Sequence, residues 1–333
     1  MSMLRYTIRR VLQGIPLILG VATITFFLTN AIPGNPVDIM LGPSPSAQQA
    51  AELKAKFGLD RPVYIRYINY LWGLFQGDLG WSLFYDAPVS QKILERLPVT
   101  LLLLVSSFAF AIVTAIPLGV ISAWRRNKPV DHVSRVVALV GVATPSFWIG
   151  LVLIIVFSYH FDLLPATDLI LPWAAPAAVE GASTRVDVLI KAGQHLILPT
   201  VSLGTLRMAT LTRIERSSML EVLNKDYVRL PKAYGVSDRT ILRKHAFRNA
   251  QLPAITVIGL QITRALGGAV LTETIFSING LGLLIITAIK NQDYQLIMGT
   301  TLFFGIMFVV GVIITDISYA YLDPRVSYGD SDG

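Results

Sequence analysis

Long apolar stretches alternate with shorter polar segments along this chain of 333 residues. A helix that crosses the hydrocarbon core of a bilayer needs about 20 predominantly apolar residues, and six of the stretches have about that length. The pattern therefore predicts an all-α integral membrane protein with six transmembrane helices. The predicted spans are residues 11–32, 99–123, 136–160, 197–214, 252–276 and 296–321.

The polar segments on the two sides of these spans differ in charge. Lysine and arginine are concentrated before the first span, between the second and third, and between the fourth and fifth. Six spans bring these three segments to one side, whereas the segment at residues 162–195 carries only Arg185 and Lys191. Because short cytoplasmic loops are rich in lysine and arginine, both termini are predicted to be cytoplasmic.

This topology divides the chain into cytoplasmic, membrane-spanning and external parts. In the external part, at residues 33–97, aromatic and leucine residues recur at helical spacing over residues 64–75, which is typical of a helix lying in the membrane interface. Residues 46–57 are also amphipathic. The parts are a cytoplasmic N-terminus (1–10), an uncleaved anchor helix (11–32), an extracytoplasmic region (33–97), a five-helix core (98–322) with a cytoplasmic loop (216–251), and a cytoplasmic tail (323–333).

Composition supports a membrane protein and excludes several other classes. Hydrophobic residues make up 53% of the chain and charged residues 15%, with a mean hydropathy of +0.59, which is too apolar for a soluble domain. The net charge of +7 lies in short loops beside apolar spans, so it indicates topology and no nucleic-acid partner. With no cysteine, the chain has no disulfide, thiolate metal site or cysteine nucleophile.

Signatures of catalysis are missing from the sequence. There is no glycine-rich loop ending in Gly-Lys-Ser/Thr for nucleotide phosphates, no His-Glu-x-x-His zinc motif and no Gly-x-Ser-x-Gly nucleophile turn. The four histidines are scattered over different segments without obvious partners. We therefore expect no enzyme activity, metal site or cofactor in this chain.

The basic loop at residues 216–251 is patterned to fold. Asp226 is suited to cap a short helix over residues 227–234, and Gly235 is suited to the left-handed conformation that ends such a helix. Ser237 or Asp238 is suited to cap a second helix that runs toward Asn249. A loop required only for topology would not need this order of helix, glycine and helix.

The same loop carries a resemblance to a known family. Residues 245–253 read His-Ala-Phe-Arg-Asn-Ala-Gln-Leu-Pro, and together with Gly235 they resemble the cytoplasmic-loop motif of the membrane subunits of prokaryotic ATP-binding-cassette importers. The match is to the dipeptide, oligopeptide and nickel branch, and it is most similar to the first of its two permeases. Further segments similar to that branch are residues 31–36, 58–62, 77–80, 217–223, 267–270, 273–276 and 322–325.

The resemblance implies a fold, partners and roles. It implies the type I importer permease fold, a second homologous permease, two cytosolic ATPases that bind ATP and magnesium, and an extracytoplasmic binding protein. It also implies that the first short helix of the loop inserts into a cleft on an ATPase, with apolar contacts from three residues, charged contacts from two, and a bend at the glycine. The residues assigned to this coupling are Asp226, Tyr227, Val228, Arg229, Leu230, Lys232, Ala233 and Gly235.

Three features leave alternatives open. Pro231 stands where family loops usually have a small residue, so the short helix either begins near Leu230 or is kinked there. Arg207 and Arg264 fall near the middle of predicted spans, where a charge is costly. They either line the translocation path, together with Glu273, or form ion pairs with carboxylates. The candidates for pairing are Glu215, Glu273, Asp316 and the partner subunit.

We therefore predict a permease subunit of an ATP-driven, binding-protein-dependent importer of dipeptides, oligopeptides or similar small solutes. The same machinery carries oligosaccharides or nickel in other members of the branch, and no residue here separates these substrates. A secondary transporter is the main alternative of another class, but it would need more spans or inverted repeats, and also buried acidic residues for ion coupling, and the basic loop of helix, glycine and helix argues against it.

Overall fold

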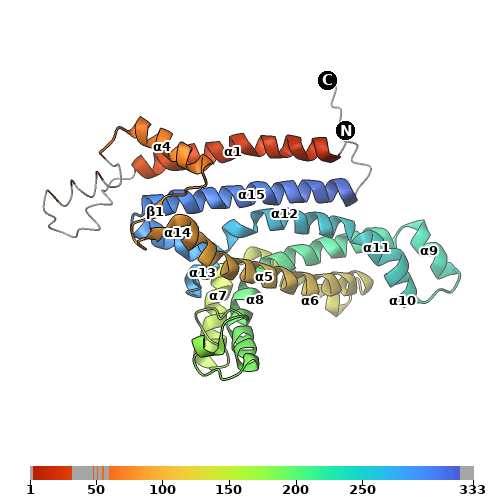
Figure 1. Ribbon diagram of the computed structural model, residues 1–333. Helices are drawn as coiled ribbons and strands as arrows, with labels where there is room; N and C mark the ends of the chain where they lie inside the picture. Colours follow the sequence, from red (N-terminus) through yellow and green to blue (C-terminus); the bar gives the residue numbers. More distant parts are fainter. Residues whose placement is uncertain (1–2, 32–47, 49–50, 52–54, 56–59, 323–333) are drawn as a thin grey trace. The chain divides into compact units, whose positions relative to one another are not determined.

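The computed structural model describes residues 3–31, 48, 51, 55 and 60–322, and most of these are helical (Figure 1). A two-stranded antiparallel hairpin, β1 (Trp81–Ser82) with β2 (Ala87–Pro88), pairs Trp81 with Pro88. The α-helices are α1 (Met3–Ala31), α4 (Val63–Phe75), α5 (Val89–Trp124), α6 (Pro129–Ala143), α7 (Ser146–Leu153), α8 (Arg185–Leu223), α9 (Asp226–Ala233), α10 (Asp238–Thr240), α11 (Phe247–Ala250), α12 (Leu252–Gly268), α13 (Val270–Ile275), α14 (Leu281–Lys290) and α15 (Tyr294–Leu322). Two π-helices, η1 (Ile154–His160) and η3 (Ile241–Ala246), and a 3-10 turn, η2 (Pro176–Ala178), complete the set.

The chain divides into two compact units. The first comprises the chain up to Thr100 and again from Asn279 onward, and the second comprises Leu101–Ile278. In the first unit, α1 and α15 run side by side as the red and dark blue helices of Figure 1. A Cβ atom at Gly14 would lie 2.6 Å from a methyl carbon of Val309, so glycine is what permits this close approach.

The helix predicted at residues 64–75 is present as α4. Tyr67 and Tyr70 pack against Phe26 of α1, with ring centroids 5.3 and 5.5 Å away, and the Tyr67 hydroxyl lies 2.8 Å from that of Thr23. The opposite face of α4 leaves large apolar side chains exposed. The helix α4 is therefore fixed to α1 by its tyrosines. The other predicted amphipathic segment, residues 46–57, falls almost wholly outside the described part of the chain.

Asp293 joins the hairpin to the start of α15. Ser82 Oγ donates to its Oδ2 at 2.5 Å and the amide of Phe84 donates to the same oxygen at 3.1 Å, while the amide of Leu296 donates to Oδ1 at 3.1 Å. One buried carboxylate thus caps α15 and accepts two hydrogen bonds from the hairpin.

In the second unit the 39-residue helix α8 packs against α6, α7, α12 and the second half of α5. Its start is specified locally by a capping box: Asp187 N donates to Thr184 Oγ1 at 3.2 Å, and Thr184 N donates to Asp187 Oδ2 at 2.8 Å. Close approach to α5 requires a small residue, since a Cβ at Gly204 would lie 2.6 Å from the ring of Phe110. The helix α8 is therefore the element around which the second unit is built.

Three predicted spans coincide with helices that are long and apolar enough to cross a membrane. Among the described residues these are Thr7–Ala31, Val89–Trp124 and Tyr294–Thr315. The second of them starts ten residues before the predicted span at 99, because five of residues 90–96 are polar or charged and concealed its beginning. Predicted spans four and five lie in α8 and in α12 with α13, which do not meet the same test of length and apolar composition.

The third predicted span, residues 136–160, is divided by a sharp bend between α6 and α7. The chain changes direction by 106° between the helix α6 and the segment Ser146–His160. Thr144 precedes Pro145 and has extended backbone angles, φ −99° and ψ 127°, because the proline ring disfavours the helical conformation in the residue before it. The predicted tail at residues 323–333 lies outside the described residues.

Candidate functional site

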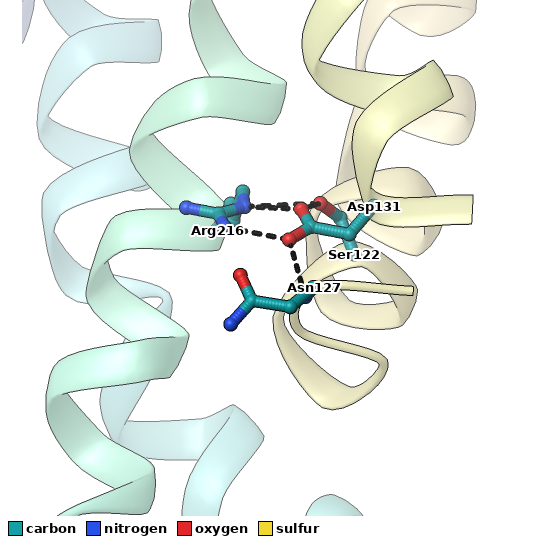
Figure 2. Close-up of polar contacts among 4 residues, drawn as sticks. All are labelled: Ser122, Asn127, Asp131 and Arg216. Atoms are coloured by element: carbon teal, nitrogen blue, oxygen red, sulfur yellow. Dashed lines mark hydrogen bonds and ion pairs between the residues drawn. The ribbon is translucent and has the colours of Figure 1, made fainter. Parts of the chain in front are cut away.

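The basic loop is joined to the rest of the second unit by an ion pair between a buried carboxylate and a partly buried arginine (Figure 2). Arg216, two turns before the end of α8, donates from Nε to Asp131 Oδ1 at 2.7 Å and from Nη2 to Oδ2 at 2.9 Å. Asp131 lies in the first turn of α6 and is completely buried. This two-point contact fixes the end of α8 to the start of α6.

Two further donors complete the surroundings of Asp131. Ser122 Oγ, near the end of α5, donates to Oδ1 at 2.6 Å, and the amide of Asn127 donates to Oδ2 at 2.9 Å. Asn127 adopts a left-handed conformation, φ +61°, which asparagine tolerates better than most residues. The carboxylate of Asp131 therefore holds together α5, the turn after it, α6 and α8.

The charges of this pair stabilise each other. Hydrogen bonding to the Arg216 guanidinium holds the pKa of Asp131 well below its usual range, and the bonds from Ser122 and Asn127 act in the same direction against the effect of burial. Asp131 in turn raises the pKa of Arg216. Both groups are thus charged at any physiological pH.

The order of helix, glycine and helix predicted for the loop is confirmed. After α8, the helix α9 covers residues 226–233, Gly235 has φ +77°, and α10, η3 and α11 follow as one helical stretch to Ala250. Asp226 is the first residue of α9 instead of its cap, and Ser237 stands at the cap position before α10 without donating or accepting a capping hydrogen bond. A π-helical segment, Ile241–Ala246, was not predicted.

Pro231 lies inside α9, as its sixth residue, so the helix does not begin near Leu230. Proline has no amide hydrogen to donate to the carbonyl of Tyr227, but α9 ends only two residues later. The following turn is closed by bonds from Tyr234 N to Leu230 O at 3.2 Å and from Val236 N to Pro231 O at 3.1 Å.

The three apolar residues assigned to coupling do not share one face. Val228 is 3% exposed and belongs to a core cluster with Met219 and Val222 of α8 and Ile241 of η3. Tyr227 and Leu230 are 47% and 59% exposed. Val228 therefore attaches α9 to its own chain, which corrects its assignment to outward contact.

The outward face of α9 forms an open hollow. It is lined by Asp226, Tyr227, Arg229, Leu230 and Ala233. Arg229 Nη2 donates to Asn224 Oδ1 at 3.1 Å, and Asn224 Nδ2 donates to Leu220 O at 2.8 Å, so the junction with α8 is also bonded. The side chain of Lys232 is outside the described part of the structure.

Two of the three residues predicted to line a translocation path, Arg207 and Glu273, are buried in the structure. Arg207 is 9% exposed, and its Nη1 donates to Leu203 O at 2.9 Å and to Ser107 Oγ at 3.3 Å, with its guanidinium 4.6 Å from the ring centre of Phe108. No carboxylate of the described residues forms an ion pair with it. Glu273 is fully buried in α13, and the side chain of Arg264 in α12 lies outside the described residues.

One acidic residue of this region, at the start of α6, was missed from the sequence. Asp131 is the only acidic residue among residues 124–135, which otherwise carry Arg125, Arg126, Lys128 and Arg135, and this isolation was a usable signal for an ion pair. Glu215 is completely buried, and neither carboxylate oxygen has a hydrogen-bond partner among the described residues. The sequence marked it only as a candidate ion-pair partner for Arg207 or Arg264.

Comparison with known proteins gives matches to two families. Residues 115–328 match the family described as binding-protein-dependent transport system inner membrane component, and residues 3–104 match its N-terminal membrane component family. The oligopeptide transport system permease protein AppB of Bacillus subtilis is 40% identical over 98% of this chain and all of the relative.

Two further relatives cover the chain equally well. The dipeptide transport system permease protein DppB of Alkalihalophilus pseudofirmus is 39% identical, and DppB of Escherichia coli K12 is 38% identical, each over 98% of this chain and 100% and 99% of the relative. The chain therefore belongs to the family of binding-protein-dependent transport system inner membrane components, and the resemblance read from its motifs is confirmed.

Proposed function

We propose that this chain is the membrane-spanning permease subunit of an ATP-driven importer, forming half of a translocation pore and transmitting the work of ATP hydrolysis to it. Relatives that match nearly the full length are permeases of dipeptide and oligopeptide transport systems, which supports peptides as the substrate class. The second half of the pore is a homologous permease, and an extracytoplasmic binding protein delivers the substrate. ATP and magnesium are held by two separate ATPase subunits, so this chain needs no cofactor.

We propose six spans with both termini in the cytoplasm. The three long apolar helices supply three spans. The other three spans are the bent pair α6 with Ser146–His160, the helix α8, and α12 with α13. Breaks of this kind are tolerated in a bilayer because neighbouring helices form hydrogen bonds with the freed backbone groups. This arrangement puts α9 on the cytoplasmic side, since it lies in the most basic loop of the chain.

The observation that carries the proposal is the division of α9 into two faces. Val228 is buried in the chain's own core, while Tyr227 and Leu230 are exposed beside an open hollow. An exposed aromatic residue with a neighbouring arginine is typical of an interface anchor. A helix that is attached on one face and exposes both apolar and charged side chains on the other is suited to receive a push from a separate subunit.

The path of such a push runs along the contacts of the second unit. Movement of α9 is transmitted to Met219 and Val222 through Val228, because these side chains share one packed cluster. From α8 it passes to α5 and α6 through the bonds of Arg216 and Asp131. Alternating access then results if ATP and loaded binding protein together favour one arrangement of these helices.

Site-directed cross-linking tests the docking surface directly. The chain has no cysteine, so Tyr227→Cys introduces a single thiol without a background. In the assembled transporter we expect this variant to cross-link to an ATPase subunit carrying single cysteines in its cleft. Val228→Cys, on the neighbouring buried position, is the matched control and should not react.

Reconstitution into vesicles distinguishes an ATP-driven importer from a secondary transporter. Vesicles that contain the two permeases alone should accumulate no peptide, and uptake should require the ATPases, ATP and the binding protein. Peptide uptake without any ATPase would contradict the proposal, as would a failure of Tyr227→Cys to capture an ATPase in a transporter that is active. Competition by unlabelled oligosaccharide or nickel, in place of peptide, would reassign the substrate.

A further inference from the structure

A cavity of about 640 Å³ lies between α6 and α8, beside the Asp131–Arg216 ion pair. Its polar wall consists of His132 and Arg135 from α6, and of Arg213, Arg216 and Ser217 from α8. Residues three or four apart on a helix lie on the same face, which explains how these side chains converge from two helices. The function proposed above gives this cavity no role.

The cavity carries positive charge that the protein does not neutralise. Within the described part of the chain, neither Arg135 nor Arg213 has an ion-pair or hydrogen-bond partner, and both are exposed. Asp131 is already engaged by Arg216, and Glu215 packs toward Gly119 of α5. No carboxylate is among the lining residues, so the positive charge of the two arginines is open to an anion from outside the chain.

The remaining wall of the cavity is apolar. Val136 and Leu139 of α6 and Ile214 of α8 line it, and Val136 and Leu139 are 59% and 64% exposed. Leu139 lies two helical turns beyond His132, roughly 10 Å further along α6. A small free anion would leave this apolar wall uncovered, whereas a molecule with an anionic head and a hydrocarbon chain would cover both parts.

We propose that this cavity binds one anionic phospholipid, with its phosphate between Arg135 and Arg213 and an acyl chain along Val136 and Leu139. Under the proposed topology, on which this inference rests, the polar end of the cavity faces the cytoplasmic headgroup region. Basic pockets between helices at that level are suited to anionic headgroups. The bound lipid balances the charge beside Asp131 and Arg216 and so braces the joint between α6 and α8.

Native mass spectrometry of the intact purified transporter, titrated with phosphatidylglycerol or with phosphatidylcholine of the same acyl chains, measures the affinity for the first bound lipid. We expect tighter binding of phosphatidylglycerol. The double variant Arg135→Gln/Arg213→Gln should weaken it by at least about ten-fold, since each basic residue near an anionic surface contributes to attraction. Leu139→Trp should also weaken it, because the larger ring fills the apolar part of the cavity without a change in charge.

The matched control is Arg125→Gln/Arg126→Gln, which removes the same charge from exposed positions in the turn between α5 and α6 that do not line the cavity. It should leave the affinity for phosphatidylglycerol unchanged. An equal loss in both double variants, or no loss in either, would overturn the proposal.

Experiments on the same purified transporter distinguish two other possible occupants of the cavity, a free anion and a protein. Displacement of the lipid by millimolar inorganic phosphate would assign the site to a free anion and overturn the lipid proposal. Cross-linking of Arg213→Cys to the second permease would assign the cavity to a protein interface and overturn it as well. Because the readout is lipid binding, it is independent of whether the transporter carries peptides.

Discussion

Gly119 of α5 lies directly against Glu215 of α8. A Cβ atom at position 119 would be 2.7 Å from the Cβ of Glu215 and 3.1 Å from the amide nitrogen of Arg216. The two helices therefore approach each other closely one residue before the arginine that binds Asp131. Any side chain at 119 would push α8 away at the point where the ion pair holds it.

Gly119→Ala is expected to destabilise the transporter by about 1 to 3 kcal/mol, the usual cost of inserting a methyl group into a packed contact. Thermal unfolding of the purified transporter, followed by scanning fluorimetry, measures it. Gly193→Ala is the matched control, because a Cβ there meets nothing within 4 Å and alanine favours a helix interior. Equal midpoints for the two variants would contradict the close contact.

Asp131→Asn should destabilise the chain by about 3 kcal/mol, because it leaves the partly buried Arg216 without its carboxylate. The Arg216 side chain is 20% exposed and that of Asp131 is 0% exposed. Glu221→Gln breaks the exposed pair with Lys225 and should cost no more than about 0.5 kcal/mol. A comparable shift in the unfolding midpoint for both variants would show that burial does not matter here.

The effect of Asp131→Asn should depend on pH in a defined direction. The pKa of Asp131 is lowered in the folded chain, so its contribution to stability is complete above the pKa of an unfolded aspartate, about 3.9, and is lost as pH falls below that value toward the folded pKa. The difference in midpoint between wild type and variant should be constant between about pH 6 and 8 and should narrow below about pH 4. A difference that grows on acidification would contradict the ion pair.

Gly235→Val should uncouple ATP turnover from uptake. The backbone at Gly235 has φ +77°, and a side chain would meet nothing within 4 Å, so the only cost is conformational, about 1 to 2 kcal/mol for a non-glycine residue. Gly235→Asn is the matched variant, because asparagine tolerates this conformation, and it should retain most uptake. Paired measurements of ATP hydrolysis and peptide uptake in vesicles distinguish the two, and loss of uptake in both variants would mean that size matters instead of the backbone angle.

The sequence by itself determined the features that depend on local pattern. Apolar length identified the helices at the first, second and sixth predicted spans, because burial in hydrocarbon requires a long uncharged helix wherever it occurs. Local backbone preference likewise identified the short helix, the bend at Gly235 and the second helix, since a positive φ is a property of one residue. Motif similarity identified the family.

Only the tertiary structure decided which side chains of those elements face inward. Val228 and Tyr227 are neighbours with similar apolar character, and packing against Met219 and Ile241 is what separates them into an anchor and an exposed residue. The partnership of Asp131 with Arg216 joins residues 85 apart, so it depends on how α6 and α8 pack. The cavity between α6 and α8 also arises from how these two helices pack, which local sequence does not encode.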